Sequence, residues 1–231
     1  MIRLRKEIRT IGRDFLNEGE TEVYRFPKEW SLREYSLKDI EALGEEGIQE
    51  AISREFPYKG DTSSLDALMK GKKSAVILID DITRPTPAYE VVPHLLNRLT
   101  EAGIAQDEIT FIFAIGTHRP LTEEEMAMKI GKEAVRKYRV ENHDAFNGDF
   151  ADLGYTSYGT PVRINKKVVE ADLVITLGTL AKHRFVYACG GSKIIVPGVA
   201  HQETILKNHK GMAEAQREEG QKFGKTSLDM D

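Results

Sequence analysis

Cysteine is nearly absent from this sequence, which has a single such residue, Cys189, among 231. No disulfide can therefore form within the chain, and this favours a reducing compartment. Long apolar runs are absent as well, because none approaches the roughly 18 residues that a membrane-spanning helix needs. The basic residues 1–6 are not followed by the apolar segment of a signal peptide. These absences predict a soluble, cytoplasmic protein.

An excess of positive charge is also absent, because 33 basic and 37 acidic residues leave a net charge of −4. This balance gives no electrostatic reason to expect binding to nucleic acid or to an anionic membrane. A small anionic substrate is still compatible with it, since one local arginine or lysine is enough to hold such a molecule. Hydrophobic residues make up 40% of the chain, which is sufficient for one large domain with a sizeable core.

Three short apolar runs are present, and they predict buried strands at Ala75–Ile79, 109–115 and Leu173–Leu177. Helical patterns lie between these runs. One is an apolar stripe over residues 91–99, and another begins after Thr122, which is placed to cap a helix that opens with three glutamates. The alternation predicts an α/β fold with a mainly parallel, Rossmann-like sheet and helices on both of its faces.

The flanking segments complete the predicted organisation. Residues 1–70 are expected to form an N-terminal α+β cap of the same domain, with strands at 21–26 and 30–35 and a solvent-facing helix at 40–55. Residues 71–212 form the predicted catalytic domain, in which 142–148 is a loop and 162–169 a strand or hairpin arm. The polar residues 213–231 are expected to be a tail, a frayed helix or the start of a linker.

Polar residues follow each predicted strand, and ligands of open α/β sheets bind beyond the carboxyl ends of strands. We therefore expect the three strand exits to converge on one crevice. The first exit carries Asp81, Thr83 and Arg84, followed by Pro85 and Pro87. The prolines stiffen the backbone and help present the arginine to a carboxylate or phosphate. The alternative is a rigid turn in which Asp81 and Arg84 pair with each other.

The second and third exits add histidines and a lysine. His118 is well placed for acid–base chemistry, with capping of the following helix as the alternative. The third exit leads through His183 to Gly190, Gly191 and Lys193. Two glycines allow backbone N–H groups to approach an anion closely, and the lysine can contact phosphate or form a covalent bond. A glycine turn with an exposed lysine is the alternative.

His209 lies four residues after Ile205, so the two share one face of a predicted helix. A structural role and a metal-binding role are both open for this histidine. Together with His118 and His183 it could form a zinc site, which makes a zinc-dependent hydrolase one alternative function. The absence of a closely spaced histidine pair in the sequence disfavours that function.

Taken together and in this order, the motifs resemble the nickel-dependent lactate racemase family over roughly residues 75–212. The segments that carry the resemblance are Asp81-x-Thr83-Arg84-Pro85-Thr86-Pro87, Gly116-Thr117-His118-Arg119-Pro120, Asn142-His143-Asp144, Gly159-Thr160-Pro161-Val162, His183, Gly190-Gly191-x-Lys193, Pro197-Gly198 and His209. The sequence departs from the family at Lys182, where a proline is usual, and across residues 185–189, where small residues are common.

The resemblance implies a nickel-pincer nucleotide, a pyridinium mononucleotide that carries nickel in a sulfur–carbon–sulfur pincer. By resemblance, Lys193 joins the cofactor through a thioamide and His209 binds the nickel, while His118 and His183 form an acid–base pair. Arg84 is a substrate-carboxylate contact, and Asp81 touches the substrate or the cofactor ribose. The remaining cofactor-binding residues expected in these loops are Thr83, Gly190, Gly191 and Ser192.

The implied reaction is racemisation or epimerisation of a 2-hydroxyacid by hydride transfer to and from the bound cofactor. Cofactor maturation proteins are the implied partners. Family members are about twice as long, and their C-terminal domain, which closes over the cofactor, is not recognisable in this sequence. Three explanations stay open: the chain is a truncated piece, it is a subunit whose C-terminal domain acts in trans, or it is a stand-alone relative with another use. A cofactor- or nickel-binding fragment without turnover of its own is the second alternative function.

Overall fold

The computed structural model describes residues 4–10, 22–27, 46–47, 50, 65–182 and 188–218. The chain divides into two compact units, Met1–Gly44 and Glu45–Asp231. In the first unit, strand β1 (Leu4–Thr10) pairs with strand β2 (Glu22–Pro27) in antiparallel fashion. Strand β2 lies one residue later than predicted. The strand predicted at 30–35 and most of the helix predicted at 40–55 fall outside the described residues.

The second unit is built on a four-stranded parallel sheet with the order β5-β4-β3-β8. Its strands are β3 (Ala75–Ile79), β4 (Ile109–Phe113), β5 (Arg139–Asn142) and β8 (Leu173–Leu177). Ala75 pairs with Ile109 on one side and with Leu173 on the other. The predicted α/β fold is confirmed. Strand β4 ends at Phe113, before the predicted end at 115, and β5 was not predicted.

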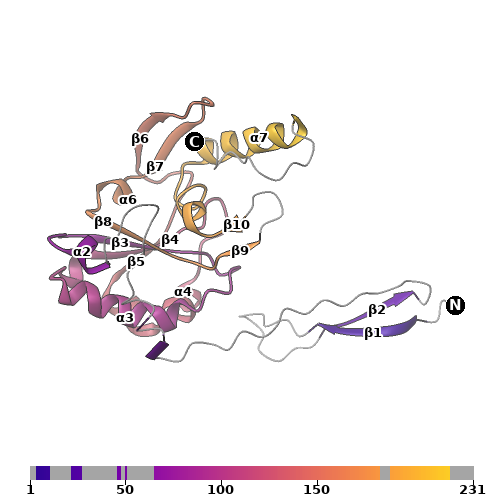
Figure 1. Ribbon diagram of the computed structural model, residues 1–231, viewed down its shortest axis with the longest axis horizontal. Coiled ribbons are helices and arrows are strands. Elements are labelled where there is room, and N and C mark those ends of the chain that lie inside the picture. Colours follow the sequence, from indigo (N-terminus) through magenta and orange to yellow (C-terminus); the bar gives the residue numbers. More distant parts are fainter. Residues whose placement is uncertain are drawn as a thin grey trace. The chain divides into compact units, whose positions relative to one another are not determined.

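Helices cover both faces of this sheet, as predicted (Figure 1). One face packs against α3 (Ala88–Glu101), α4 (Glu123–Ile130) and α5 (Lys132–Lys137). The other face packs against α6 (Lys166–Glu170), the 3-10 helix η2 (Gly191–Ile194) and α7 (Gln202–Glu218). The strand pattern explains the two cores, because Ile77 and Ile79 face the first group while Val76 and Leu78 face the second.

Shorter elements complete the second unit. They are α2 (Leu65–Met69), the 3-10 helix η1 (Gln106–Glu108), the hairpin of β6 (Phe150–Tyr155) and β7 (Pro161–Asn165), and the pair β9 (Ala181–Lys182) and β10 (Ala188–Cys189). The strand predicted at 162–169 is too long. It ends at Asn165, whose side chain accepts a hydrogen bond of 3.0 Å from the backbone N–H of Lys167 and so caps α6.

Helix α7 continues through Glu218, into the segment that was predicted as a tail, a frayed helix or the start of a linker. Residues 219–231 lie outside the described residues. Within the described residues, every helix is too short or too polar to cross a membrane.

The strand order fixes where a ligand site is expected. From β3 the chain moves outward to β4 and then β5, and it later returns to β8 on the opposite side of β3. The direction of winding therefore reverses between β3 and β8. In doubly wound sheets a crevice opens at such a reversal, beyond the carboxyl ends of the strands.

Candidate active site

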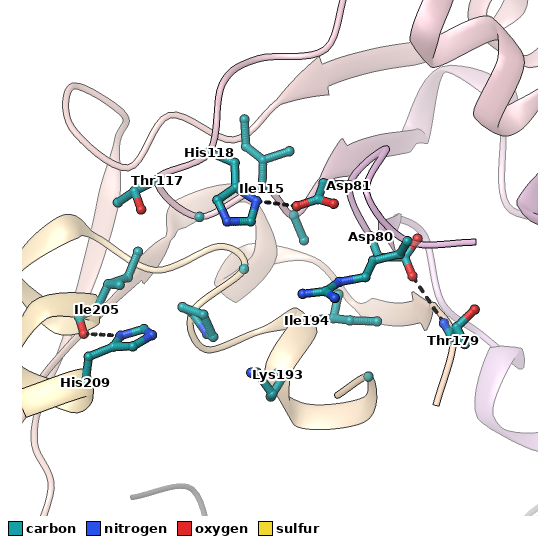
Figure 2. A pocket seen from close by; sticks show the side chains of 16 residues that line it. Asp80, Asp81, Ile115, Thr117, His118, Thr179, Lys193, Ile194, Ile205 and His209 are labelled. Carbon is teal, nitrogen blue, oxygen red and sulfur yellow. Dashed lines mark hydrogen bonds and ion pairs between the residues drawn. The ribbon is translucent and has the colours of Figure 1, made fainter. Parts of the chain in front are cut away.

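A cavity of about 220 Å³ lies at this end of the sheet (Figure 2). It is lined by residues that directly follow β3, β4 and β8, together with residues of η2 and α7. The structure thus brings the three strand exits together. Six of the predicted site residues line the cavity: Asp81, Arg84, His118, Gly190, Lys193 and His209.

The pair Asp81 and His118 crosses from the first strand exit to the second. Nδ1 of His118 is hydrogen-bonded to Oδ2 of Asp81, and the other carboxylate oxygen accepts from the backbone N–H of Thr83 at 2.9 Å and from its hydroxyl. Asp81 has a side chain 8% exposed, whereas that of His118 is 58% exposed. The sequence left open an ion pair between Asp81 and Arg84. Both residues are described by the structure, and their side chains do not form this pair.

The environment of Asp81 favours its charged form. Burial alone would raise the pKa of this carboxyl, but the hydrogen bonds from Thr83 and His118 outweigh burial and lower the pKa below its usual value. An ionised Asp81 accepts the proton on Nδ1 of His118. The second ring nitrogen, Nε2, is then left as the basic atom of a neutral imidazole.

Asp80, next to Asp81, forms a buried polar network at the base of the cavity. Its Oδ2 accepts a hydrogen bond of 3.1 Å from the backbone N–H of Thr179 and another from the hydroxyl of Thr86. Its Oδ1 forms an ion pair of 2.9 Å with Nζ of Lys129, which also donates to the carbonyl of Arg84 at 2.6 Å. These contacts join the loop after β3 to the loop after β8 and to α4.

A tight turn holds His118 after β4. The backbone N–H of His118 donates to the carbonyl of Ile115 at 2.9 Å, and Gly116 has a φ of +55°. The N–H of Gly116 donates to the carbonyl of Gly198 at 2.9 Å, which ties this turn to the segment after η2. The helix that follows is capped by Thr122, so the alternative role of His118 as its cap is wrong.

Lys193 lines the cavity from η2, two residues after the glycine pair. Gly190 has a φ of +88°, and a Cβ atom there would lie 2.7 Å from the carbonyl oxygen of Thr179. Only glycine therefore allows this turn to pack against the loop after β8. Gly191 and Ser192 lie in η2 but do not line the cavity. Thr83 does not line it either, but its backbone N–H bonds the carboxylate of Asp81, which does.

His209 faces the same cavity from α7 (Figure 2). Its Nδ1 donates a hydrogen bond of 2.7 Å to the carbonyl of Ile205, one turn earlier in the helix. This bond places the ring proton on Nδ1 and leaves the lone pair on Nε2. Histidines that bind metals commonly have this arrangement, in which a backbone carbonyl fixes the tautomer.

His183, the remaining predicted acid–base residue, lies outside the described residues, as do residues 184–187. Within the described part of the chain, no three or more histidine, cysteine, aspartate or glutamate side chains group as a metal site. His143 is buried away from the cavity: its Nε2 donates to the carbonyl of Ala200 at 2.9 Å. Burial lowers the pKa of His143.

Asp80, Thr179 and Lys129 were not singled out from the sequence. Asp80 and Thr179 stand at strand exits that the sequence did identify, so their position was an available signal. Lys129 follows the core-facing Glu125 by four residues, and this helical spacing was the only trace of its burial.

Comparison with known proteins gives the same assignment as the motifs. The family model described as the lactate racemase N-terminal domain matches residues 18–220. The chain belongs to the lactate racemase family. It is 34% identical to the lactate racemases of Lactiplantibacillus plantarum, over 71% of this chain, and of Thermoanaerobacterium thermosaccharolyticum, over 70% of it. In both cases the match covers 38% of the relative, so the chain spans about two-fifths of the length of these lactate racemases.

Solved structures agree with this membership. The lactate racemase apoprotein from Thermoanaerobacterium thermosaccharolyticum superposes with a TM-score of 0.67 and 32% identity, covering 83% of this chain and 44% of that one. A protein from Thermotoga maritima superposes with a TM-score of 0.62 and 25% identity, covering 75% of this chain and 42% of that one. The parallel sheet and its covering helices are therefore the fold of the N-terminal part of a lactate racemase.

Proposed function

We propose that this chain is the cofactor-bearing half of a 2-hydroxyacid racemase that acts on lactate-like substrates. The observation that carries the proposal is the meeting of Arg84, His118, Lys193 and His209 around one cavity at the reversal point of the sheet. These side chains offer a cation for a carboxylate, a base, a nucleophilic amine and a metal ligand. Membership of the lactate racemase family supports the same reaction class.

The donor set fits the nickel-pincer nucleotide that the motifs imply. A pincer supplies most of the metal ligands itself, so one protein ligand is sufficient. Nε2 of His209 meets that need, because Nδ1 is already bonded to the carbonyl of Ile205. Lys193, which lines the same cavity, would hold the cofactor covalently. When bound, the group supplies a reversible hydride acceptor, which avoids a carbanion at the weakly acidic α-carbon.

The residues of the chain would bind the substrate and move its proton. Arg84 would orient the carboxylate through paired N–H donors. His118, held by Asp81, would accept the hydroxyl proton of the substrate on Nε2 and would return that proton to the same oxygen in the reverse direction. Racemisation needs a second base on the opposite face of the flat 2-oxo acid, and we assign that role to His183.

Lys193 gives the direct test. The chain is co-expressed with pincer-cofactor maturation proteins and examined by intact-protein mass spectrometry and nickel analysis. We expect a nickel-bearing mass adduct on the unaltered chain and its loss in Lys193→Ala. Lys207→Ala is the matched control, because Lys207 lies exposed on α7 outside the cavity and should keep the adduct.

The outcomes separate the functions under discussion. An adduct with racemase activity supports the proposal, and an adduct without turnover supports a cofactor-binding fragment. If neither adduct nor nickel is found, the remaining part of a lactate racemase is added in trans; continued absence of both would contradict the proposal. Hydrolase activity with bound zinc would replace it.

A further inference from the structure

Lys129 is a buried lysine to which the proposed reaction gives no role. Its side chain is 1% exposed, although lysine is almost never fully buried without a partner. Nζ of Lys129 lies 2.9 Å from Oδ1 of Asp80 and 2.6 Å from the backbone carbonyl of Arg84. The ammonium thus contacts the main chain of the residue that we assign to the substrate carboxylate.

The partners of Lys129 are themselves fixed. Oδ2 of Asp80 accepts from the backbone N–H of Thr179 at 3.1 Å and from the hydroxyl of Thr86, and the two threonine hydroxyls lie 2.7 Å apart. Lys129 therefore joins three segments, namely α4, the loop after β3 and the loop after β8. The side chains of Lys129, Asp80 and Thr86 are buried, and hydrogen bonds to charged groups contribute most in such surroundings.

Arg84 is held on both sides of its Cα atom. Its N–H donates to the carbonyl of Asp81 at 3.1 Å, and its own carbonyl accepts from Lys129. A side chain that starts from an anchored backbone loses less conformational freedom when it binds a ligand. We propose that Lys129 is a positioning residue, which fixes the main chain of Arg84 so that the guanidinium is oriented before the carboxylate arrives.

The anchoring does not depend on the function of the cavity, whereas its benefit for a carboxylate rests on the proposed function. The two are tested separately on the full chain without cofactor. The first measurement is amide hydrogen exchange by NMR for Thr83, Arg84 and Thr179, with Ile77 and Phe111 as references within the sheet. The variants are Lys129→Met, the double variant Asp80→Asn/Lys129→Met, and the control Lys132→Met, which alters an exposed lysine just after α4.

In Lys129→Met we expect exchange at Thr83 and Arg84 to accelerate at least about tenfold more than at Ile77 and Phe111, because a charge-assisted bond that holds the loop is lost. The double variant also removes the charge of Asp80, which the single variant leaves unpaired. It should therefore recover global stability, while hydrogen exchange at the Arg84 amide stays fast. It also carries the test if the single variant does not fold. Equal acceleration at all five amides, or recovery of Arg84 protection in the double variant, would overturn the anchoring role.

The second measurement is titration with L-lactate, followed through the side-chain Nε–H signal of Arg84. We expect the double variant to bind lactate about tenfold more weakly than the unaltered chain, as suits a loss of preorganisation rather than of the guanidinium itself. Unchanged affinity together with a mobile Arg84 main chain would overturn the positioning role. No response in the unaltered chain would contradict the assignment of Arg84 to the carboxylate, and hydrogen exchange alone would then decide the anchoring.

Discussion

At the scale of single residues, Asp81 determines which nitrogen of His118 is basic. The N–H and hydroxyl of Thr83 both bond Oδ1 of Asp81, so in Asp81→Asn the amide oxygen should stay with Thr83. The amide nitrogen would then face Nδ1 of His118 and donate to it. We expect the neutral ring to change from the Nδ1–H to the Nε2–H tautomer, which nitrogen-15 NMR of the His118 ring distinguishes.

The same change should lower racemase activity in the cofactor-loaded enzyme by roughly a thousandfold or more, as in other aspartate–histidine pairs whose tautomer is reversed. Asp107→Asn is a matched control, since Asp107 is exposed in η1, and it should leave the ring signals unchanged. Retention of the Nδ1–H tautomer in Asp81→Asn would contradict the role of Asp81.

His143 is a second residue whose ionisation we expect to measure. Burial lowers its pKa from 6.5, so the unfolded chain binds a proton more readily than the folded one. The free energy of unfolding should therefore fall as pH decreases below 6.5, by at most about 1.4 kcal/mol per pH unit, until the folded-state pKa is reached. Urea unfolding at several pH values should show this slope, and His143→Gln should reduce it. An equal slope in the variant would be evidence against this assignment.

At the scale of elements, α4 depends on the way it begins. The hydroxyl of Thr122 accepts from the N–H of Glu125 at 3.2 Å, and the Glu125 carboxylate accepts from the N–H of Thr122 at 2.9 Å. Arg119 adds two bonds to that carboxylate, at 2.8 and 2.5 Å. These contacts, with that of Arg119 the largest, lower the pKa of Glu125 to about 2.

We therefore expect Glu125→Gln to reduce the free energy of unfolding by about 1–2 kcal/mol at pH 7, a value that allows for solvent screening of the exposed Arg119. The stabilisation is complete above pH 4.5 and is lost as pH falls toward 2, so wild type and variant should converge in acid. Urea unfolding at pH 7 measures the loss of stability, and urea unfolding at pH 3 measures the convergence. Glu124→Gln removes a charge from the same turn. It should lower the free energy of unfolding by less than Glu125→Gln does, because Glu124 is exposed. A loss of stability independent of pH would exclude this ionisation as the cause.

At the scale of the whole molecule, the sheet was predictable wherever apolar runs were long enough to be recognised. Strands β3 and β8 have the predicted bounds because their sequences are wholly or almost wholly apolar. Strand β5 was missed because Arg-Val-Glu-Asn is short, polar and placed at the edge of the sheet, where only one neighbour supports it. Register and strand order come from packing between distant segments, and no local pattern encodes them.

The location of the site was predictable from the sequence, but the partners of its residues were not. Parallel strands end at one edge of a sheet, so polar residues after β3, β4 and β8 had to gather there. The partner of Asp81 was not predictable, because Arg84 is three residues away in sequence and His118 is far along the chain. Lys129 was hidden for a different reason: a lysine on an amphipathic helix is ordinarily solvated, and the partners that accompany its burial, Asp80 and the carbonyl of Arg84, are distant in sequence.

The cavity depends on both hydrophobic cores, since Ile115 belongs to one and Ile194 and Ile205 to the other. We expect truncation of either core to destabilise the whole unit. Leu99→Ala and Leu78→Ala remove fully buried side chains from opposite faces of the sheet, and each should lower the free energy of unfolding by about 2–5 kcal/mol. Leu206→Ala, at a residue 73% exposed, should change it by less than about 0.5 kcal/mol.

The measurement is urea unfolding followed by far-UV circular dichroism and by the methyl NMR signals of Ile194 and Ile205. Coincident transitions in all variants would mean that the sheet and the cavity wall unfold together. The opposite result would be seen in Leu78→Ala alone. In that variant the methyl signals of Ile194 and Ile205 would be lost at a lower urea concentration than the circular dichroism signal. The wall formed by η2 and α7 would then be a separate, weaker unit, and the positions of Lys193 and His209 would depend on the second core rather than on the sheet as a whole.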